Sequence, residues 1–301
     1  MKRKISLSNR LSGWMILSSF FFHFLPLWAL VPTERPNLRE PTGIAPAFFG
    51  PNALPIPDMS DGQTYDRLRL ELAADGYFGY DGSRTGDIFA RVQIPLFTRW
   101  ANLNVWMPVY EWYSQTDGIG GGASDVYLST DIQVLHNEWF HTGKAKYIPQ
   151  MVLRIGIKTA SGEQFERKRH FDSPGYFFDL ALGQSIPLKR VTFRFACSAG
   201  FLCWQTDSGR QNDAVMYGIQ AQLKHEYFSL KATWGGYVGW ERYGDAPMSI
   251  KFRAAGHVKG LEPYVQYQYG IKDYPFHQIR VGLVYNLDIL KSLRHKEQRQ
   301  K

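Results

Sequence analysis

The sequence contains only two cysteines, Cys197 and Cys203, and their spacing excludes a disulfide bond between them. They share one predicted strand, where a rise of roughly 3.3 Å per residue would hold them about 20 Å apart. A metal or redox site would need more ligands than the chain offers nearby. We therefore expect two small apolar side chains and no cofactor.

Long apolar helices are also lacking. The mean hydropathy is −0.31, although hydrophobic residues make up 44% of the chain and aromatic residues 15%. A bundle of membrane helices needs segments of about 20 mostly apolar residues, so that class of protein is excluded. A membrane β-barrel is not excluded, because its lumen-facing residues are polar and lower the average.

The body of the chain lacks an excess of charge of one sign. The formal net charge is +8. Four of the cations, from Lys2 to Arg10, lie at the start of the chain, and the short stretch from Lys291 to Lys301 accounts for the rest of the excess. Between these ends the chain is nearly neutral and has no basic stripe with interleaved aromatics, so we expect no binding of nucleic acid.

Residues 1–29 have the form of a secretory signal peptide. A basic start is followed by an apolar stretch from Trp14 to Leu30, and Leu27 and Ala29 occupy the cleavage positions. A transmembrane anchor is the alternative, but the stretch is short for a span and contains Pro26. We therefore predict export of the chain and removal of this segment.

Residues 30–64 form a proline-rich leader. Proline argues against both a helix and a central strand, so this segment is neither a domain nor part of a sheet. The leader also carries Phe48, Phe49, Leu54 and Ile56, which prefer burial. We therefore expect it to lie in or under the lumen of a barrel and to narrow it. Its prolines are Pro32, Pro36, Pro41, Pro46, Pro51, Pro55 and Pro57.

From residue 65 to residue 287, runs of about ten residues alternate in polarity. In the first run, leucines from Leu68 to Leu72 alternate with charged residues from Arg67 to Glu71, so one face suits lipid and the other suits water. The pattern predicts an all-β fold, a transmembrane antiparallel up-and-down β-barrel of about twelve strands, followed by a basic tail over residues 288–301. Further runs begin near Ile88, Ala101, Asp125, Met151, Phe178, Val191, Val215, Phe228, Met248, Leu261 and Ile279.

The predicted connections alternate between long and short. Polar loops over Ser114–Ser124, Ala160–Gly175 and Thr206–Asp213 follow odd-numbered strands. Long loops on one rim and short turns on the other are typical of outer-membrane proteins, with both termini on the periplasmic side. The link near His141–Lys144 is tight only if its strands extend below the membrane. The other expected tight links lie around Phe97–Arg99, Pro187–Lys189, Lys224–Glu226 and Lys259–Gly260.

Aromatic residues gather near the predicted strand ends, as in the girdles that mark membrane interfaces. The alternative is the aromatic core of a soluble sandwich. A sandwich needs polar exposed faces, whereas here the apolar and charged faces both continue across all strands. The residues assigned to the girdles are Tyr77, Phe78, Trp100, Tyr110, Trp112, Tyr113, Tyr237, Trp240, Tyr274 and Tyr285.

Two stretches carry a resemblance to known families. Gly156 and the segment Lys158–Gly162, leaving a strand for a long loop, resemble the strand-to-loop hallmark of channel-like proteins of the phenol meta-pathway transporter type, although Ala160 stands where that family has proline. The blocks Ala47–Asp58 and Cys203–Gly218 resemble a family of Gram-negative outer-membrane β-barrels. The resemblance implies location and fold, and no particular activity.

Strand parity assigns a set of charged residues to the lumen. Acids balance the cations in the first six strands, but in the last six the cations face only Glu262, which leaves about +5 on one wall. Such a wall would concentrate anions in a narrow channel. Alternatively, the cations pair with acids across the barrel. The predicted lumen-lining residues are Arg67, Arg69, Arg91, Arg154, Lys158, Arg194, Lys224, Lys231, Lys251, Arg253 and Arg280.

Two loops carry many hydrogen-bonding groups. The loop with Asp207, Arg210, Asn212 and Asp213 could grip a sugar or close over the lumen, or it could simply be solvated. The run Glu163–Arg169 likewise either contacts lipopolysaccharide phosphates or forms a solvated loop.

We predict a porin-like channel that passes small, anionic solutes, surrounded by the lipids and lipopolysaccharide of the bacterial outer membrane. An enzyme is not expected, because His257 and Ser249, which share a strand face, are eight residues and therefore over ~20 Å apart. Alternatives are a lipid-processing enzyme of the outer membrane and a structural or adhesive barrel without transport.

Overall fold

The computed structural model describes residues 56–79, 84–96, 99–115, 118–140, 147–162, 174–205, 211–239, 246–272 and 276–289. The predicted signal peptide, most of the leader and nearly all of the basic tail lie outside these ranges. Within them, no helix has both the length and the apolar character needed to cross a membrane.

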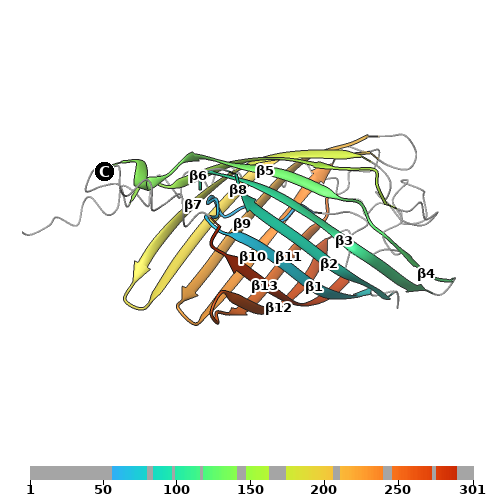
Figure 1. Ribbon diagram of the computed structural model, residues 1–301. Coiled ribbons are helices and arrows are strands. Elements are labelled where there is room, and N and C mark those ends of the chain that lie inside the picture. Colours follow the sequence, from blue (N-terminus) through green and yellow to red (C-terminus); the bar gives the residue numbers. More distant parts are fainter. Residues whose placement is uncertain are drawn as a thin grey trace, which may run out of the picture. The chain divides into compact units, whose positions relative to one another are not determined.

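Twelve antiparallel strands close into a barrel, and a short thirteenth strand, β4, pairs only with β3 (Figure 1). The first and last strands, β1 and β13, pair along their whole length and so close the ring. The predicted fold class is confirmed. The strands are β1 (Leu68–Gly79), β2 (Arg84–Pro95), β3 (Ala101–Gln115), β4 (Gly118–Gly122), β5 (Tyr127–Leu135), β6 (Gln150–Lys158), β7 (Gly175–Leu188), β8 (Val191–Gln205), β9 (Gln211–His225), β10 (Phe228–Gly239), β11 (Met248–Gly256), β12 (Leu261–Lys272) and β13 (Phe276–Leu287).

Each strand buries one face in the lumen and exposes the other. In β6, Arg154 and Lys158 are buried, whereas Ile155 and Ile157 are 53% and 48% exposed on the outer face. Exposed aliphatic side chains of this kind continue around the ring, as a lipid-facing surface requires. The polarity alternation in the sequence therefore fixes which side chains line the lumen.

A β-bulge in β3 shifts this alternation. Ile88 pairs with Tyr110 but Phe89 pairs with Pro108, so Val109 is an extra residue. Proline has no N–H to donate to a ladder, and bulges are where a strand tolerates it. Beyond the bulge Glu111 faces the lumen, fully buried, although simple alternation from the start of the strand would turn it outward.

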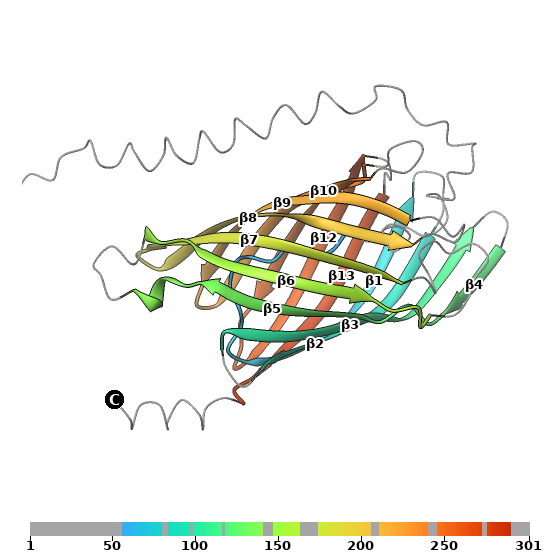
Figure 2. The same ribbon diagram turned by 90° about the horizontal axis from the view of Figure 1, so that it is seen from above.

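The segment predicted as a polar loop over Ser114–Ser124 contains strand structure. β3 runs on to Gln115 and forms a hairpin with the glycine-rich β4, which extends past the barrel (Figure 2). β5 pairs with β3 only from Ala101 to Trp106, so β4 lies beside the far half of β3. The loop expectation is wrong here because the β2–β3 ladder continues beyond the membrane-spanning length.

One link at the short-turn end is long. The condition for a tight link near His141–Lys144 is not met, because β5 ends at Leu135 and β6 begins at Gln150. The connection starts with a 3-10 turn over Asn137–Trp139, in which the Glu138 N–H donates to His136 Nδ1 at 3.2 Å. Burial lowers the pKa of the His136 imidazole, which favours the neutral, hydrogen-bond-accepting ring.

Parity, rather than position at a strand end, decides which aromatics face the membrane. Phe78, Tyr110, Trp112 and Tyr285 are exposed on the outer face, as predicted for girdles. The same prediction is wrong for two others: Tyr77 and Tyr237 are buried in a lumenal cluster. The side chains of Tyr113, Trp240 and Tyr274 lie outside the described residues.

Candidate functional site in the lumen

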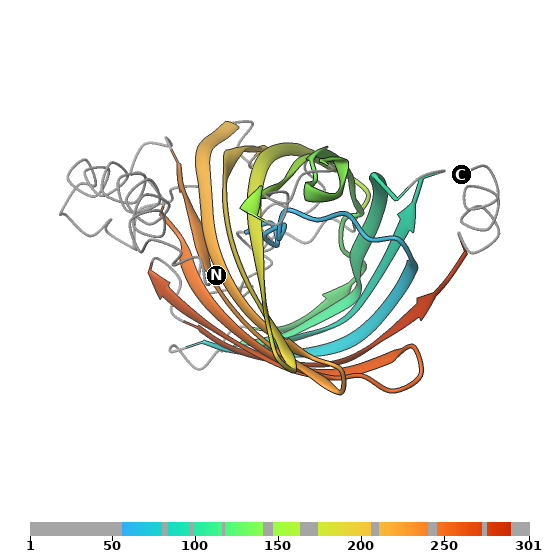
Figure 3. The same cartoon turned by 90° about the vertical axis from the view of Figure 1, so that its left-hand side faces the viewer.

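The end of the leader, residues 56–64, runs inside the barrel and continues through Tyr65 toward β1, as Figure 3 shows in blue. Near the short-turn end its backbone bonds to lumen-facing amides. The Thr64 N–H donates to Gln133 Oε1 at 3.0 Å, and the Tyr65 N–H donates to Asn102 Oδ1 at 2.7 Å. The backbone N–H groups of this segment therefore donate to side chains of the strands and not to the backbone of a neighbouring strand.

Two glycines let the leader approach the wall closely. Gly62 has a φ of +81°, a conformation that favours glycine. A Cβ on Gly62 would lie 2.7 Å from the Gly183 backbone nitrogen on β7, and a Cβ on Gly183 would meet the Asp61 carbonyl oxygen. Larger residues at either position would push the leader off the wall.

Arg194 on β8 anchors the same stretch. Its Nε and Nη2 donate to the Asp61 carbonyl oxygen at 3.1 and 2.5 Å. Its Nη1 donates to Gln150 Oε1 at 2.6 Å and to Ser185 Oγ at 2.7 Å. With its donors used in this way, the predicted lumen cation Arg194 holds a peptide segment.

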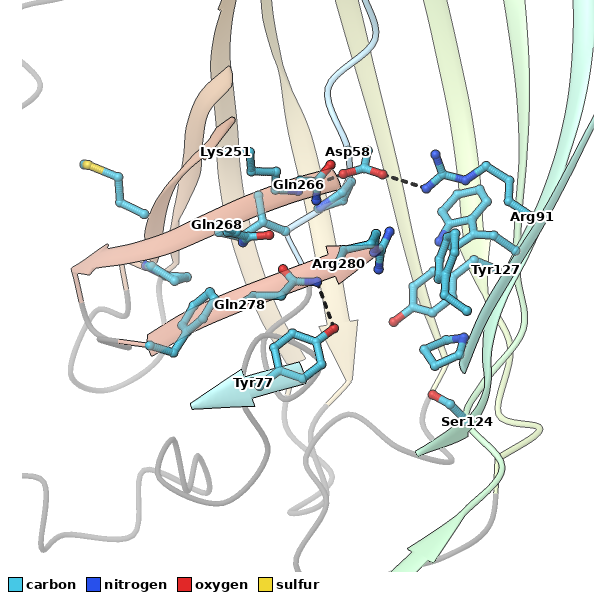
Figure 4. A pocket seen from close by; sticks show the side chains of 18 of the residues that line it. Asp58, Tyr77, Arg91, Ser124, Tyr127, Lys251, Gln266, Gln268, Gln278 and Arg280 are labelled. Atoms are coloured by element: carbon cyan, nitrogen blue, oxygen red, sulfur yellow. Dashed lines mark hydrogen bonds and ion pairs between the residues drawn. The ribbon is translucent and has the colours of Figure 1, made fainter. Parts of the chain in front are cut away.

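Asp58 of the leader is clamped between two separate strands (Figure 4). Arg91 on β2 donates from Nη2 to Oδ2 at 2.6 Å, and Lys251 on β11 donates from Nζ to Oδ1 at 2.7 Å. Burial alone would raise the pKa of the Asp58 carboxyl, but Lys251 and Arg91 hold it well below its usual range. The leader thus brings a stable negative charge to the middle of the lumen.

Acids balance the basic wall predicted on the last six strands. Arg253 lies 3.3 Å from Glu71, and Arg280 Nε donates to Asp75 at 2.7 Å. Together with Arg194 beside Asp61 and Lys251 beside Asp58, four of the six wall cations have acidic partners. The expectation that they face only Glu262 is wrong, because barrel closure places β1 beside β13 and the leader adds two aspartates.

The remaining predicted residues fall into three groups. Four of them line the lumen and pair with acids. Arg69 pairs with Glu262, and Arg91 pairs with Asp58 and Glu71. Arg154 pairs with Asp179, and Lys158 pairs with Asp125. Lys231 is half-buried beside Arg253 in the β10–β11 register. Arg67 and Lys224 are exposed at the short-turn end, so their assignment to the lumen wall is wrong. Arg67 precedes β1 and Lys224 lies where the β9–β10 hairpin leaves the barrel.

The loop candidates are only partly described. Asn212 and Asp213 belong to β9, which begins at Gln211, so the loop assignment of these two residues is wrong. The ladder between β8 and β9 continues outward to Gln205 paired with Gln211. Asp207, Arg210 and the run Glu163–Arg169 lie outside the described residues.

Beside Asp58 the lumen opens into a cavity of about 970 Å³, a volume that includes the open solvent at its mouth. Aromatic and polar side chains alternate around it: Arg91 lies over the rings of Phe89 and Trp106, and Arg280 lies over Phe89. Sequence reasoning missed the aromatic residues, although lumen parity on each strand was a usable signal. The aromatic residues include Phe89, Trp106, Tyr127, Trp204 and Phe276, and the polar residues include Arg91, Lys251, Gln266, Gln268, Gln278 and Arg280.

The histidines have structural partners in the described part of the chain. The His136 ring hydrogen-bonds with Gln150, and His277 Nδ1 with the Tyr267 hydroxyl at 2.6 Å. His257 Nδ1 lies 3.8 Å from Glu262. Among the described residues, no group of three or more His, Cys, Asp or Glu side chains is arranged to hold a metal ion.

Comparison with known proteins gives a structural likeness. No protein-family model matches the sequence, and no curated protein matches it. The fold is similar to the COG4313 outer membrane channel from Pseudomonas putida F1, with a TM-score of 0.51 and 11% identity over 77% of this chain and 100% of that one. The NanC porin has a TM-score of 0.45 and 12% identity over 72% and 100% of the two chains. The first of these likenesses shows the fold alone: the chain has the fold of a bacterial outer-membrane β-barrel.

Proposed function

We propose that the protein is a channel of the bacterial outer membrane that passes small solutes through its lumen. The observation that carries this is an open cavity inside a closed barrel with charged and amide side chains on its lumen face. Twelve strands lie between eight-stranded barrels, which side chains fill, and sixteen-stranded open porins. The similar structure from Pseudomonas putida F1 is itself described as a channel.

The conducting form has the leader displaced. With the leader in place, Asp58 and Asp61 neutralise cations on three strands and occupy part of the lumen. Displacing them uncovers Arg91, Lys251 and Arg194, and positive potential in a narrow lumen raises the local concentration of anions. The preference for anionic solutes follows from this uncovered set.

The same proposal covers export and location. Residues 1–29 are removed as a signal peptide, the short-turn end faces the periplasm, and lipopolysaccharide surrounds the long loops. Exposed aliphatic side chains such as Leu72 and Val281, 61% and 57% exposed, form the lipid-facing surface.

Recording from the purified full-length protein in planar bilayers, with ion substitution, tests the proposal. We expect discrete conductance steps and a reversal potential in a salt gradient that shifts toward the anion. Heat-dependent mobility on gels verifies that the barrel is assembled. An assembled barrel without conductance contradicts the channel. Hydrolysis of phospholipid or lipid A would then favour the enzyme, and its absence a structural or adhesive role.

A further inference from the structure

The leader contacts two chemically different sets of lining side chains at once, named here the aromatic wall and the polar wall, whose members alternate around the cavity. Ile56 packs against the aromatic cluster that contains Tyr127 and Trp204. Two residues later, the Asp58 carboxylate lies between Arg91 and Lys251 on the polar wall. A segment of this chain therefore presents an apolar group and a carboxylate, roughly 7 Å apart along the backbone, to the two walls.

The cavity also offers polar atoms that the leader leaves unused. Trp204 is 1% exposed, and its indole N–H has no acceptor among the described residues. Gln278 is 2% exposed; its side-chain nitrogen donates to Asp75, but its carbonyl oxygen has no donor in the same part of the structure. Buried donors and acceptors are normally satisfied, so these two atoms are unused hydrogen-bonding groups of the cavity lining, and neither is accessible to solvent with the leader docked.

We propose that this cavity is a binding site for small carboxylates with an apolar ring, and that Ile56–Asp58 occupies it as an internal pseudo-ligand. The carboxylate takes the place of Asp58 between Arg91 and Lys251, as cations in a fixed geometry recognise carboxylates. The ring replaces Ile56 against the aromatic wall. An inorganic anion would use only the polar wall, and a neutral ring only the apolar one.

Occupation by the leader makes ligand and leader competitors. A tethered group acts at an effective concentration in the millimolar range, so it weakens the apparent affinity for any free ligand of the same site. By linkage, a bound ligand disfavours the docked leader to the same extent. The inference rests on the proposed function in one respect: the ligand reaches the cavity through the lumen.

Calorimetric titration of the full-length protein in detergent with benzoate tests the site. Asp58→Asn removes the competing carboxylate, and we expect it to bind benzoate about tenfold more tightly than the unaltered protein. Glu138→Gln is the charge-matched control, because Glu138 pairs with the exposed Arg99 and does not line the cavity. Its affinity for benzoate should equal that of the unaltered protein.

Two further comparisons establish the two walls. In the Asp58→Asn background, Arg91→Gln should abolish binding of benzoate, and Lys251→Gln provides a second variant for the same wall. Acetate, which lacks the ring, and benzyl alcohol, which lacks the carboxylate, should each bind at least about tenfold more weakly than benzoate. Heat-dependent mobility on gels, equal to that of the unaltered protein, shows that the barrel of each variant is assembled.

Equal benzoate affinity in the Asp58→Asn and unaltered proteins overturns the pseudo-ligand. Full benzoate binding after the loss of Arg91 or Lys251 overturns the polar wall, and acetate binding as tightly as benzoate overturns the apolar one. Because titration in detergent needs no transport, the two proposals fail separately. Conductance without benzoate binding contradicts the site alone, and binding without conductance contradicts the channel alone.

Discussion

The two halves of the lumen are narrowed by different means. Toward the long loops, the barrel's own side chains narrow the interior around the cavity, with Tyr77, Phe177 and Trp204 buried in one cluster. Toward the short turns, a separate segment fills the interior, and Arg194 and Gln133 hold that segment by hydrogen bonds. One half is narrowed by residues of the wall, and the other is closed by a peptide that leads into the first strand.

The aromatic cluster and the leader differ in how easily each can leave the lumen. Removing the aromatic cluster from the lumen would require strands to separate, and strand ladders in a closed barrel leave no free edges. Removing the leader requires only that side-chain hydrogen bonds and ion pairs exchange for water. The lumen therefore has a fixed constriction and a displaceable one.

Truncation of the leader is expected to have the largest effect. A chain in which the export signal is joined directly to Tyr65 loses Asp58, Asp61 and the segment between them. The time-averaged conductance of a single channel should rise several-fold, because the leader can then no longer close the short-turn half of the lumen. An unchanged time-averaged conductance from an assembled barrel would show that the leader only tethers the chain.

Loss of a buried ion pair should come next. Arg154 and Asp179 are 8% and 0% exposed, so Asp179→Asn leaves a buried cation and should lower the free energy of unfolding by about 3 kcal/mol. Glu262→Gln breaks the pair with Arg69, whose side chains are 20% and 24% exposed, and should cost less than about 1 kcal/mol. Urea unfolding in lipid vesicles compares the two. An equal decrease in the free energy of unfolding for both variants would mean that the two ion pairs are equally exposed to water.

Charge reversal at Lys251 and Arg253 tests whether the cations that line the lumen determine its ion selectivity. Lys251 and Arg253 pair with Asp58 and Glu71. Replacing both cations with glutamate in the truncated chain should move the reversal potential in a salt gradient toward cations. The control is Lys224→Glu, which changes charge at the exposed rim. If the double variant and the control give the same selectivity, the wall does not govern passage.

Acidification should have the smallest effect. The Asp58 pKa lies well below its ordinary value of 3.8, so its contribution to docking is complete above that pH and is lost only as the pH falls further. Conductance of the full-length protein should therefore be the same at pH 7 and pH 5. A rise over this interval would mean that another group controls the leader.

Much of the architecture could be predicted because it follows from local rules. Alternation places Arg154 and Lys158 inside and Ile155 outside without any knowledge of neighbouring strands. Alternation fails only where the backbone departs from regular geometry, as at the Val109 bulge, which turned Glu111 inward. Position near a strand end predicts that Tyr77 and Tyr237 face the membrane, but strand parity turns both into the lumenal cluster.

The charge balance of the lumen could not be predicted from separate halves of the chain. Arg280 meets Asp75 across a sequence separation of 205 residues, and Lys251 meets Asp58 across 193. A count of acids and cations within each half of the sequence cannot include such pairs, because their two members lie in different halves. Closure of the ring makes them neighbours.

The sequence by itself determined the strands, their faces and the membrane-spanning barrel, because side-chain alternation and turn chemistry act over a few residues. Only the tertiary structure decided what fills the lumen. Where the leader lies, which cations it neutralises and which aromatics surround the cavity all depend on contacts across the closed ring. Those contacts join residues such as Asp58, Arg91 and Lys251, which no local pattern connects.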